Sequence, residues 1–516
     1  MGLLPWAKLP QAFPTPETLT AVISLGLCSY LIIGLFYRLY LHPLTEFPGP
    51  KLAAATFLYE FHFNRQGTFI WQLEKLHDQY GSIIRITPDE LHIKDSSFYD
   101  EIYAGGLRVR NKDKRFVKMF GTPRALVAIA DHAHHRVRRG LLGEFFSKRS
   151  IVKMEPIIND AIDKLSQRLC DARKTGVVIN MDAAFAAMTA DVITRHGWGQ
   201  SGNYLEHGSF NKQWKDAVIG TMGSRVLFRH FPIMLNVLTA MPLPLLLWID
   251  PGVADILKIE DLVRRLSIEN VNRGATRKQE SKTIFDALND PNLPPDQRTA
   301  EHLVDEGHIL LLAGTETTAK ALTTGLCYLL LPENKNVLMT LQTELRQTYP
   351  NVSTWPTWNE VQKLPYLTGV INECLRLSHG LSCRLPRAAP KETLQYQQWQ
   401  IPPGTPVSQT TYFVHMDESL FPDPERFEPD RWIRASEEGR RLEKYIVSFS
   451  KGSRQCIGIN MAYAEMYLTL THIMRRFDFA LHNTSADDVR LFRDFFFGAA
   501  QDGSVGVQAV VADVKR

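Results

Sequence analysis

The segment FSKGSRQCIG, residues 449–458, places Cys456 between two glycines and two residues after an arginine. A thiolate is a strong, soft ligand for a transition metal, and one thiolate is sufficient if a porphyrin supplies the other donor atoms. Gly452 and Gly458 let the backbone approach a flat molecule closely, and Arg454 offers a cation to a carboxylate on that molecule. The segment by itself also fits a buried structural cysteine in a glycine turn.

A second candidate for chemistry is AGTETT, residues 313–318, inside an apolar stretch whose spacing predicts one helix over 299–331. A glycine inside a helix costs about 1 kcal/mol relative to alanine, so a local function should offset it. Threonine hydroxyls can bond the carbonyl one turn earlier and loosen the helix at this point. A polar patch on the helix surface is the alternative. Helical geometry places on one face Leu310, Ala313, Gly314 and Thr317.

Other charged stretches have less specific meanings on their own. ECLR at 373–376 places a carboxylate and a guanidinium at i, i+3, which is most often an exposed pair worth a few tenths of a kcal/mol. It is followed by FPDPERFEPDRW at 421–432. Further arginines lie in SCRLPR at 382–387 and in HHRVRR at 134–139.

Together these motifs resemble those of the cytochrome P450 superfamily. The resemblance is strongest to microsomal fungal members of secondary metabolism, such as the trichodiene oxygenase group. Phe449, Gly452, Arg454, Cys456 and Gly458 all match the family's haem-binding loop. The likeness covers nearly the whole chain. It implies a mainly α (α+β) fold with a long central helix, small β-sheets and an N-terminal transmembrane helix.

The resemblance implies a role for each matching residue. Cys456 is expected to be the axial ligand of the iron of haem b. Thr317 is expected to hold water beside the oxygen site, with Glu316 on the route of proton delivery. Ala313 and Gly314 are expected to face the haem. A structural network around the cysteine loop is expected from Glu373, Arg376 and Arg431.

The carboxylates of a haem need cations, and the resemblance implies three of them. These are Arg454 in the cysteine loop, Arg384 in SCRLPR and Arg139 in HHRVRR. His135 stands where the family usually has tryptophan, although an imidazole can also hydrogen-bond a propionate.

The implied reaction is the insertion of one oxygen atom of O2 into a substrate, with electrons from NADPH. The chain contains no dinucleotide- or flavin-binding segment, so the expected donor is a separate NADPH–cytochrome P450 reductase, with cytochrome b5 as a second one. Basic residues near the cysteine loop are candidates for the docking surface, and a solvated charged loop explains them equally well. They are Arg434, Arg440, Arg441, Lys444 and Lys451.

The expected substrate is a lipophilic secondary-metabolite intermediate: a terpenoid, polyketide or alkaloid. The segments expected to line its pocket are largely apolar, with His308 nearby. An alternative is a haem-thiolate isomerase or dehydratase that needs no reductase, but such relatives tend to lose the threonine and acid of AGTETT. A non-catalytic haem sensor is a second alternative. The expected lining segments are 107–125, 223–249, Leu310 with its neighbours, 380–386 and 496–498.

Between Glu17 and Arg38 lie 20 residues without charge, enough for a helix about 30 Å long that crosses a bilayer. Positive charge is weaker before this stretch (Lys8) than after it (Arg38, Lys51), which favours a single pass through the endoplasmic reticulum membrane with a cytosolic body. The expected parts are a lumenal terminus (1–17), a transmembrane anchor (18–38), a Pro-rich hinge (39–51) and the catalytic domain (52–516).

A second uncharged run covers residues 231–249, FPIMLNVLTAMPLPLLLWI. Pro242 and Pro244 would break an ordinary spanning helix, so the run is interpreted as a surface that dips into lipid. A second span and a plain core segment are the alternatives.

The net charge, the cysteine spacing and the hydrophobic pattern give further expectations. A net charge of +4 without a dense basic stripe gives no reason to expect nucleic-acid binding. The six cysteines form no CxxC pair, which argues against a disulfide framework or a structural zinc site. Helices are predicted over 68–81, 299–331, 333–349, 364–378 and after Gly458, with strands in 82–95 and 380–415.

Overall fold

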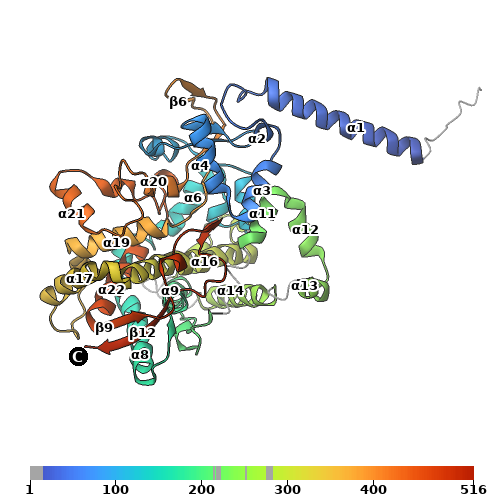
Figure 1. The fold of residues 1–516 in the computed structure, drawn as a ribbon. Coiled ribbons are helices and arrows are strands. Elements are labelled where there is room, and N and C mark those ends of the chain that lie inside the picture. The colour runs from blue at the N-terminus through green and yellow to red at the C-terminus, as the bar shows by residue number, and fades with distance from the viewer. Residues whose placement is uncertain (1–15, 213–215, 217–221, 250–252, 275–282, 516) are drawn as a thin grey trace, which may run out of the picture.

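The computed structural model describes residues 16–212, 216, 222–249, 253–274 and 283–515. Helices dominate these residues, and the strands form small sheets at the edges of the helical body (Figure 1). The mainly α fold expected from the sequence is confirmed. The helices not discussed further below are α2 Lys51–Ala55, α5 Tyr99–Ile102, α7 Lys148–Lys153, α8 Glu155–Thr175, α15 Ile284–Leu288, α18 Trp358–Val361 and α21 Asp430–Glu437.

The longest helix, α16 (Ala300–Leu330), runs through the middle of the body. The Thr299 side chain caps its start by accepting a hydrogen bond from the backbone N–H of His302. Along α16 lie α9 (Met181–Trp198) and α19 (Pro365–Ser378). An added Cβ on Gly314 would lie 2.6 Å from Ile193 Cγ1 of α9. The mid-helix glycine is therefore required by the close approach of two helices.

Most of the predicted elements are confirmed to within a few residues. The exception is the end of the segment 380–415, where residues 411–415 form the short helix α20 (Thr411–His415) instead of a strand. The elements that agree are α4 Phe69–Tyr80, β1 Ile83–Arg85, β2 Leu91–Ile93, α16, α17 Lys335–Thr348, α19 and α22 Ile459–Arg476.

The largest sheet has the strand order β1-β2-β8-β5-β3. Strand β2 pairs in parallel with β8, and the other pairs are antiparallel. This sheet brings the segment after α19 beside the segment before α6 (His132–Gly143). The remaining strands are β3 Asn111–Lys112, β4 Ile179–Asn180, β5 Arg387–Ala388, β6 Leu394–Tyr396, β7 Trp399–Ile401, β8 Pro406–Ser408, β9 Phe477–Leu481, β10 Arg493–Phe495, β11 Phe497–Ala499 and β12 Gln508–Val514.

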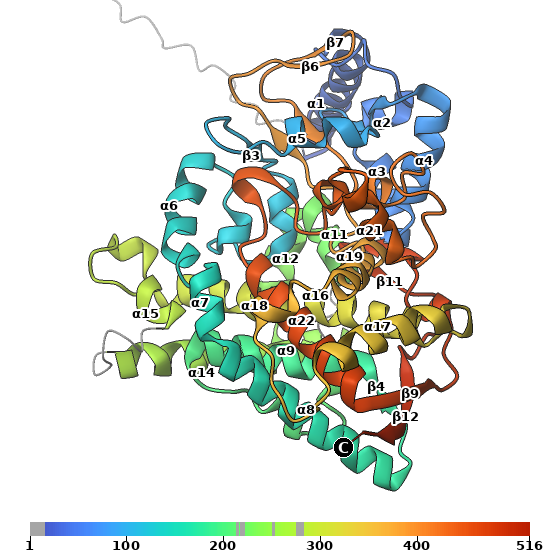
Figure 2. The ribbon, with the colours of Figure 1, turned by 90° about the vertical axis from the view of Figure 1, so that its left-hand side faces the viewer.

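Helix α1 (Pro16–Phe36) stands apart from the body and has no buried residue (Figure 1). In Figure 2 the same helix is seen nearly end-on, behind the body. Together with a π-helical turn it forms a continuous apolar helix over Pro16–Leu41, long enough to cross a membrane. The Pro-rich hinge packs on the body, since Leu44 and Phe47 are buried and the Arg85 N–H donates to Pro48 O at 2.7 Å.

The second uncharged run forms two helices, α12 (Pro232–Ala240) and α13 (Leu243–Ile249). The helical segments Pro232–Leu238 and Leu243–Ile249 meet at an angle of 118°. The break lies at the two prolines identified in the sequence. Large apolar side chains are exposed on both helices: Ile233, Val237, Leu243, Leu245, Trp248 and Ile249.

A buried carboxylate, Glu373 on α19, joins that helix to the segment before the cysteine loop. Arg376 donates from Nε and from a terminal nitrogen to its two oxygens, at 2.9 and 2.7 Å. Arg431 Nε lies 3.5 Å from the same carboxylate, and Trp432 Nε1 donates to it at 3.0 Å. Arg426 contributes only its backbone carbonyl to this network, because its side chain is exposed. The structure thus brings together the three residues proposed as a structural network.

The Arg376→Met variant is expected to destabilise the fold by roughly 3–5 kcal/mol, because it leaves Glu373 buried without its strongest partner. Urea unfolding of the detergent-solubilised protein, followed by circular dichroism, measures this loss. Arg426→Met is the matched control and should change stability by less than about 0.5 kcal/mol. Equal stability of the two variants would contradict a structural role for the pair.

Candidate active site

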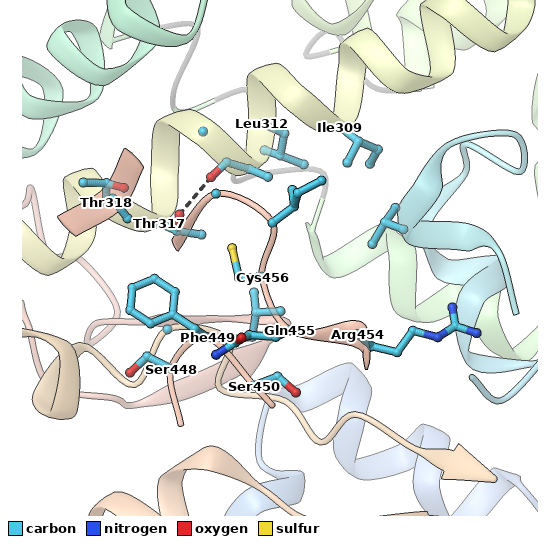
Figure 3. Close-up of a pocket in the computed structure, with 18 of the residues that line it drawn as sticks. Ile309, Leu312, Thr317, Thr318, Ser448, Phe449, Ser450, Arg454, Gln455 and Cys456 are labelled. Carbon is cyan, nitrogen blue, oxygen red and sulfur yellow. Dashed lines mark hydrogen bonds between the residues drawn. The ribbon is translucent and has the colours of Figure 1, made fainter. Parts of the chain in front are cut away.

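A cavity of about 290 Å³ separates α16 from the cysteine loop (Figure 3). This volume is close to the lower end of the about 300–1,000 Å³ that small-molecule pockets usually occupy. The cavity therefore has the size of a site for a bound small molecule. Its lining is mainly apolar, and it includes Cys456 on one side and Thr317 on the other.

The cysteine loop has a geometry that depends on its glycine. The N–H of Cys456 donates to Phe449 O at 2.9 Å, which closes the loop. Gly452 has a φ of 69° and lies against the backbone carbonyls of Tyr103 and Ala104, where any added Cβ would collide. Gly458 caps the start of α22. Several residues of the loop line the cavity, and Cys456 is the one that brings a sulfur to it.

The Cys456 sulfur points from the loop toward α16, in the direction of Thr317 (Figure 3). Burial away from bulk water raises the pKa of the Cys456 thiol, while the Gly458 N–H and the Arg139 charge lower it. A thiolate at this position would therefore be stabilised by a hydrogen bond from its own loop and by a nearby cation.

On the opposite side, Ala313, Gly314 and Thr317 of α16 line the cavity, as their helical spacing predicts. The Thr317 hydroxyl donates to Ala313 O at 2.8 Å, the bond drawn in Figure 3. Because the hydroxyl donates its hydrogen to Ala313 O and Thr317 lines the cavity, its oxygen can accept a hydrogen bond from a water or a ligand there. Glu316 is buried on the same turn and does not line the cavity.

Basic side chains gather around the cavity near the cysteine loop. Burial lowers the pKa of His135 to about 2, with the charges of Arg454 and Lys112 as the next causes. Burial also lowers the pKa of Arg454 to about 9, with Arg387 as the next cause. These groups therefore repel one another, and the negative charge of the exposed Asp131 offsets this only in part at Arg454. The basic cluster consists of Lys112, His135, Arg139, Arg387 and Arg454.

One buried nitrogen of the Arg454 side chain has no hydrogen-bond acceptor among the described residues. Its two terminal nitrogens donate to Ile129 O and Ala130 O at 2.6 and 2.7 Å, while the buried Nε has no partner among the described residues. Two carboxyl groups line the cavity, those of Glu306 on α16 and Glu465 on α22, and burial raises the pKa of both, that of Glu306 to about 7. Two or more anionic groups of a cofactor would relieve this repulsion.

Arg384 is not part of this cluster. Its side chain is buried outside the cavity, where it pairs with Glu60 at 2.5 Å and with Glu90 at 2.7 Å. Arg387, three residues later, lines the cavity instead. Residues three apart in an extended segment point to opposite sides, so only one of the two arginines can face the cavity. The placement corrects the expectation that Arg384 meets a haem carboxylate.

The other predicted site residues do come together. Phe449 and Gly458 line the cavity beside Cys456, and His135 and Arg139 line it from α6. Arg139 also donates to Gln455 O at 2.7 Å, which ties α6 to the cysteine loop. A haem requires a thiolate for its iron and cations for its carboxylates, and a thiol open to the cavity with a cluster of mutually repelling cations supplies both, so the residues present fit that cofactor.

Three charged residues of the lining lie outside the segments expected from the sequence: Glu306, Arg387 and Glu465. Arg387 could have been found from the alternation of sides along an extended strand. The other two carried no comparable signal, because their positions in the cavity depend on long-range packing. Lys112 and Arg225 line the cavity from within the expected segments 107–125 and 223–249.

Comparison with known proteins agrees with this geometry. The family model for cytochrome P450 matches residues 48–497, which is most of the chain. The chain therefore belongs to the cytochrome P450 family, and the class of protein is a haem-dependent monooxygenase of the kind found in fungal secondary metabolism.

Several relatives are similar over nearly their full length. The cytochrome P450 monooxygenase claJ of Penicillium crustosum is 78% identical over 84% of this chain and 99% of its own. Conidiogenone synthase PchP450 of Penicillium rubens is 43% identical over 95% of this chain and 98% of its own. The cytochrome P450 monooxygenase TRI4 of Trichoderma arundinaceum is 42% identical over 93% of this chain and 92% of its own.

The Arg387→Met variant is expected to lose haem at least about tenfold faster than the parent, because one charged hydrogen bond is worth about 1.5–3 kcal/mol. Haem transfer from the purified protein to apomyoglobin measures the rate. Lys118→Met, which removes an exposed cation of a nearby turn, should leave the rate unchanged. Faster loss from folded Arg384→Met than from Arg387→Met would restore the original assignment to Arg384.

Proposed function

We propose that this protein is a membrane-bound monooxygenase that inserts one oxygen atom of O2 into a lipophilic secondary-metabolite intermediate. The observation that carries the proposal is the Cys456 sulfur facing Thr317 across an apolar cavity. Electrons from NADPH arrive through a separate NADPH–cytochrome P450 reductase, with cytochrome b5 as a second donor.

The chain's own residues have distinct tasks in this proposal. Cys456 supplies the thiolate, and a haem with a thiolate ligand activates O2 for insertion into C–H bonds. The basic cluster, with Arg387 in place of Arg384, binds the haem carboxylates. Thr317 holds a water beside the oxygen site and passes a proton to it, and Glu316 one residue earlier serves the same proton route from outside the cavity.

The apolar lining supports a lipophilic substrate. Phe116 and Phe120 come from the segment before α6, and Phe496 comes from the C-terminal region. Phe120 and Phe496 meet edge to face with centroids 5.5 Å apart. These rings exclude water and complement a terpenoid, polyketide or alkaloid skeleton.

Two alternative functions, an isomerase or dehydratase and a haem sensor, would need fewer of these residues. An isomerase or dehydratase of the same family would have no use for a hydroxyl and an acid at Thr317 and Glu316. A haem sensor would need neither these residues nor a reductase. The hydroxyl facing the cavity favours oxygen chemistry over both alternatives.

The docking surface for the reductase is proposed at the side of the cysteine loop away from α16. Arg434, Arg440 and Lys451 pair there with Glu428, Glu438 and Asp100. Arg441 and Lys444 are exposed and form no ion pair with a described residue. Because their charges are not already paired, we propose Arg441 and Lys444 as the residues that attract the reductase.

Helix α1 and the α12–α13 pair support a membrane location. We propose residues 18–38 as a single-pass anchor in the endoplasmic reticulum, residues 1–17 as lumenal, and the body from residue 52 as cytosolic. The exposed apolar side chains of α12 and α13 form a second surface that dips into lipid without crossing it.

Thr317→Val is expected to lower product formed per NADPH consumed at least about tenfold and to raise hydrogen peroxide release, because proton delivery fails. The assay combines the purified protein, the reductase and NADPH, with oxygen and peroxide recorded together. Thr323→Val on the same helix is buried outside the cavity and is the matched control. Absence of any reductase-dependent oxygen consumption by the parent protein would refute the monooxygenase.

A fluorophore on Trp248→Cys is expected to be quenched by nitroxide-labelled lipids in nanodiscs, because this side chain is 81% exposed on the proposed lipid surface. The same label on Met339→Cys, which is 55% exposed on α17, should not be quenched. Both variants are made in a Cys28→Ser background, since Cys28 is exposed on α1. Equal quenching at both sites would contradict the proposed orientation.

A further inference from the structure

The cavity contains a cation that the haem does not need. Arg225 lies on α11 (Met222–His230) and lines the cavity beside the turn of residues 116–120. One terminal nitrogen donates to Phe120 O at 3.0 Å. Within the described chain this is its single hydrogen bond, and no described carboxylate pairs with it. A guanidinium has five N–H donors, so most of those of Arg225 are available to a ligand.

Arg225 is separate from the basic cluster. The members of that cluster act on one another, as the effects of Lys112, Arg139 and Arg387 on His135 show. Arg225 acts instead on His308 of α16: burial lowers the pKa of His308, the charge of Glu260 opposes this, and the charges of Arg225 and Arg264 lower it further. The recorded interactions of Arg225 are the bond to Phe120 O and the effect of its charge on His308. The charge of Arg225 is not among the causes that shift the pKa of Lys112, His135 or Arg454, so Arg225 lies outside the basic cluster.

An isolated cation in this position is costly. Burial lowers the pKa of Arg225 to about 10, which still leaves the side chain protonated at neutral pH. A buried charge without a counter-ion destabilises the protein unless a ligand supplies the opposite charge. An arginine is the side chain best suited to such a ligand, since its planar fork matches the two oxygens of a carboxylate.

We propose that Arg225 binds a negatively charged oxygen of the substrate, a carboxylate or an ionised enol, so that this enzyme acts on lipophilic acids. The inference rests on the proposed function for its oxidising centre but concerns substrate recognition alone. The acid end would be held at α11, with the apolar skeleton extending past the phenylalanine rings toward Thr317 and Cys456. Oxidation would then occur at a carbon remote from the acid.

Matched acid and ester pairs test this recognition in the full-length, haem-loaded protein. The probes are farnesoic acid with methyl farnesoate and dodecanoic acid with methyl dodecanoate, titrated by isothermal calorimetry at pH 7.5. In the parent protein the acid of at least one pair is expected to bind at least about tenfold more tightly than its ester. Arg225→Met should remove that preference by weakening the acid and leaving the ester unchanged, and Arg225→Lys should retain part of it.

Arg264→Met is the control, because Arg264 is exposed on α14 (Val253–Gly274) and pairs with Glu260 at 3.6 Å. It should leave the acid-to-ester ratio unchanged. Equal affinities, tighter binding of both esters, no detectable binding of either acid, or equal weakening of acid and ester in Arg225→Met would each overturn the inference. Reductase-dependent oxygen consumption is measured separately, so a failure of acid recognition is distinguishable from a failure of the monooxygenase.

Discussion

The sulfur of Cys456 must face a cavity that excludes bulk water, and the rest of the structure is arranged around that requirement. The loop can present the sulfur only because Gly452 takes a left-handed conformation against the carbonyls of Tyr103 and Ala104. The loop is supported from one side by α6, through the bond from Arg139 to Gln455 O. On the opposite side of the cavity, α16 is held away from the cysteine loop because it packs closely against α9 at Gly314.

The charges of the site are divided into two groups with different tasks. The basic cluster beside the cysteine loop is close-packed and mutually repulsive, which favours a cofactor with anionic edges over an empty site. Arg225 stands alone at α11 and is available to the molecule that varies between related enzymes, the substrate. One cavity can therefore combine a fixed cofactor with a specific choice of substrate.

Helix α11 connects the substrate-binding part of the cavity to the apolar surface of α12 and α13 that we propose to dip into lipid. Arg229 and His230 at its end reach the buried carboxylate of Glu60 on α3 (Leu58–Gln66), at 2.7 and 3.4 Å. Burial alone would raise the pKa of Glu60, but Arg229 and Arg384 outweigh it and hold the pKa well below the usual value. The helix is thus fixed by ion pairs directly before α12 begins. Arg384, which does not reach the haem site, contributes to the same anchor.

The chain's local pattern determined much of this protein. The glycines around Cys456, the AGTETT turn, the uncharged run before Arg38 and the spacing of the long helix were sufficient to predict the family, the cofactor and the central elements. These signals are local, because a loop around a ligand and an amphipathic or apolar helix each need residues at a fixed short spacing. Glu373 and Arg376 were similarly recognisable, since they lie one turn apart on one helix.

Only the tertiary structure decided which cations belong to which part of the site. Arg384 and Arg387 are the same type of residue and lie only three positions apart. The extended backbone nevertheless directs Arg384 toward Glu60 and Glu90 and Arg387 toward the cavity. Lys112 and Arg225 reach the cavity from segments more than 100 residues apart, so no local pattern relates them. Electrostatic interactions depend on distance in space and on burial, and both are set by the packing of the whole chain.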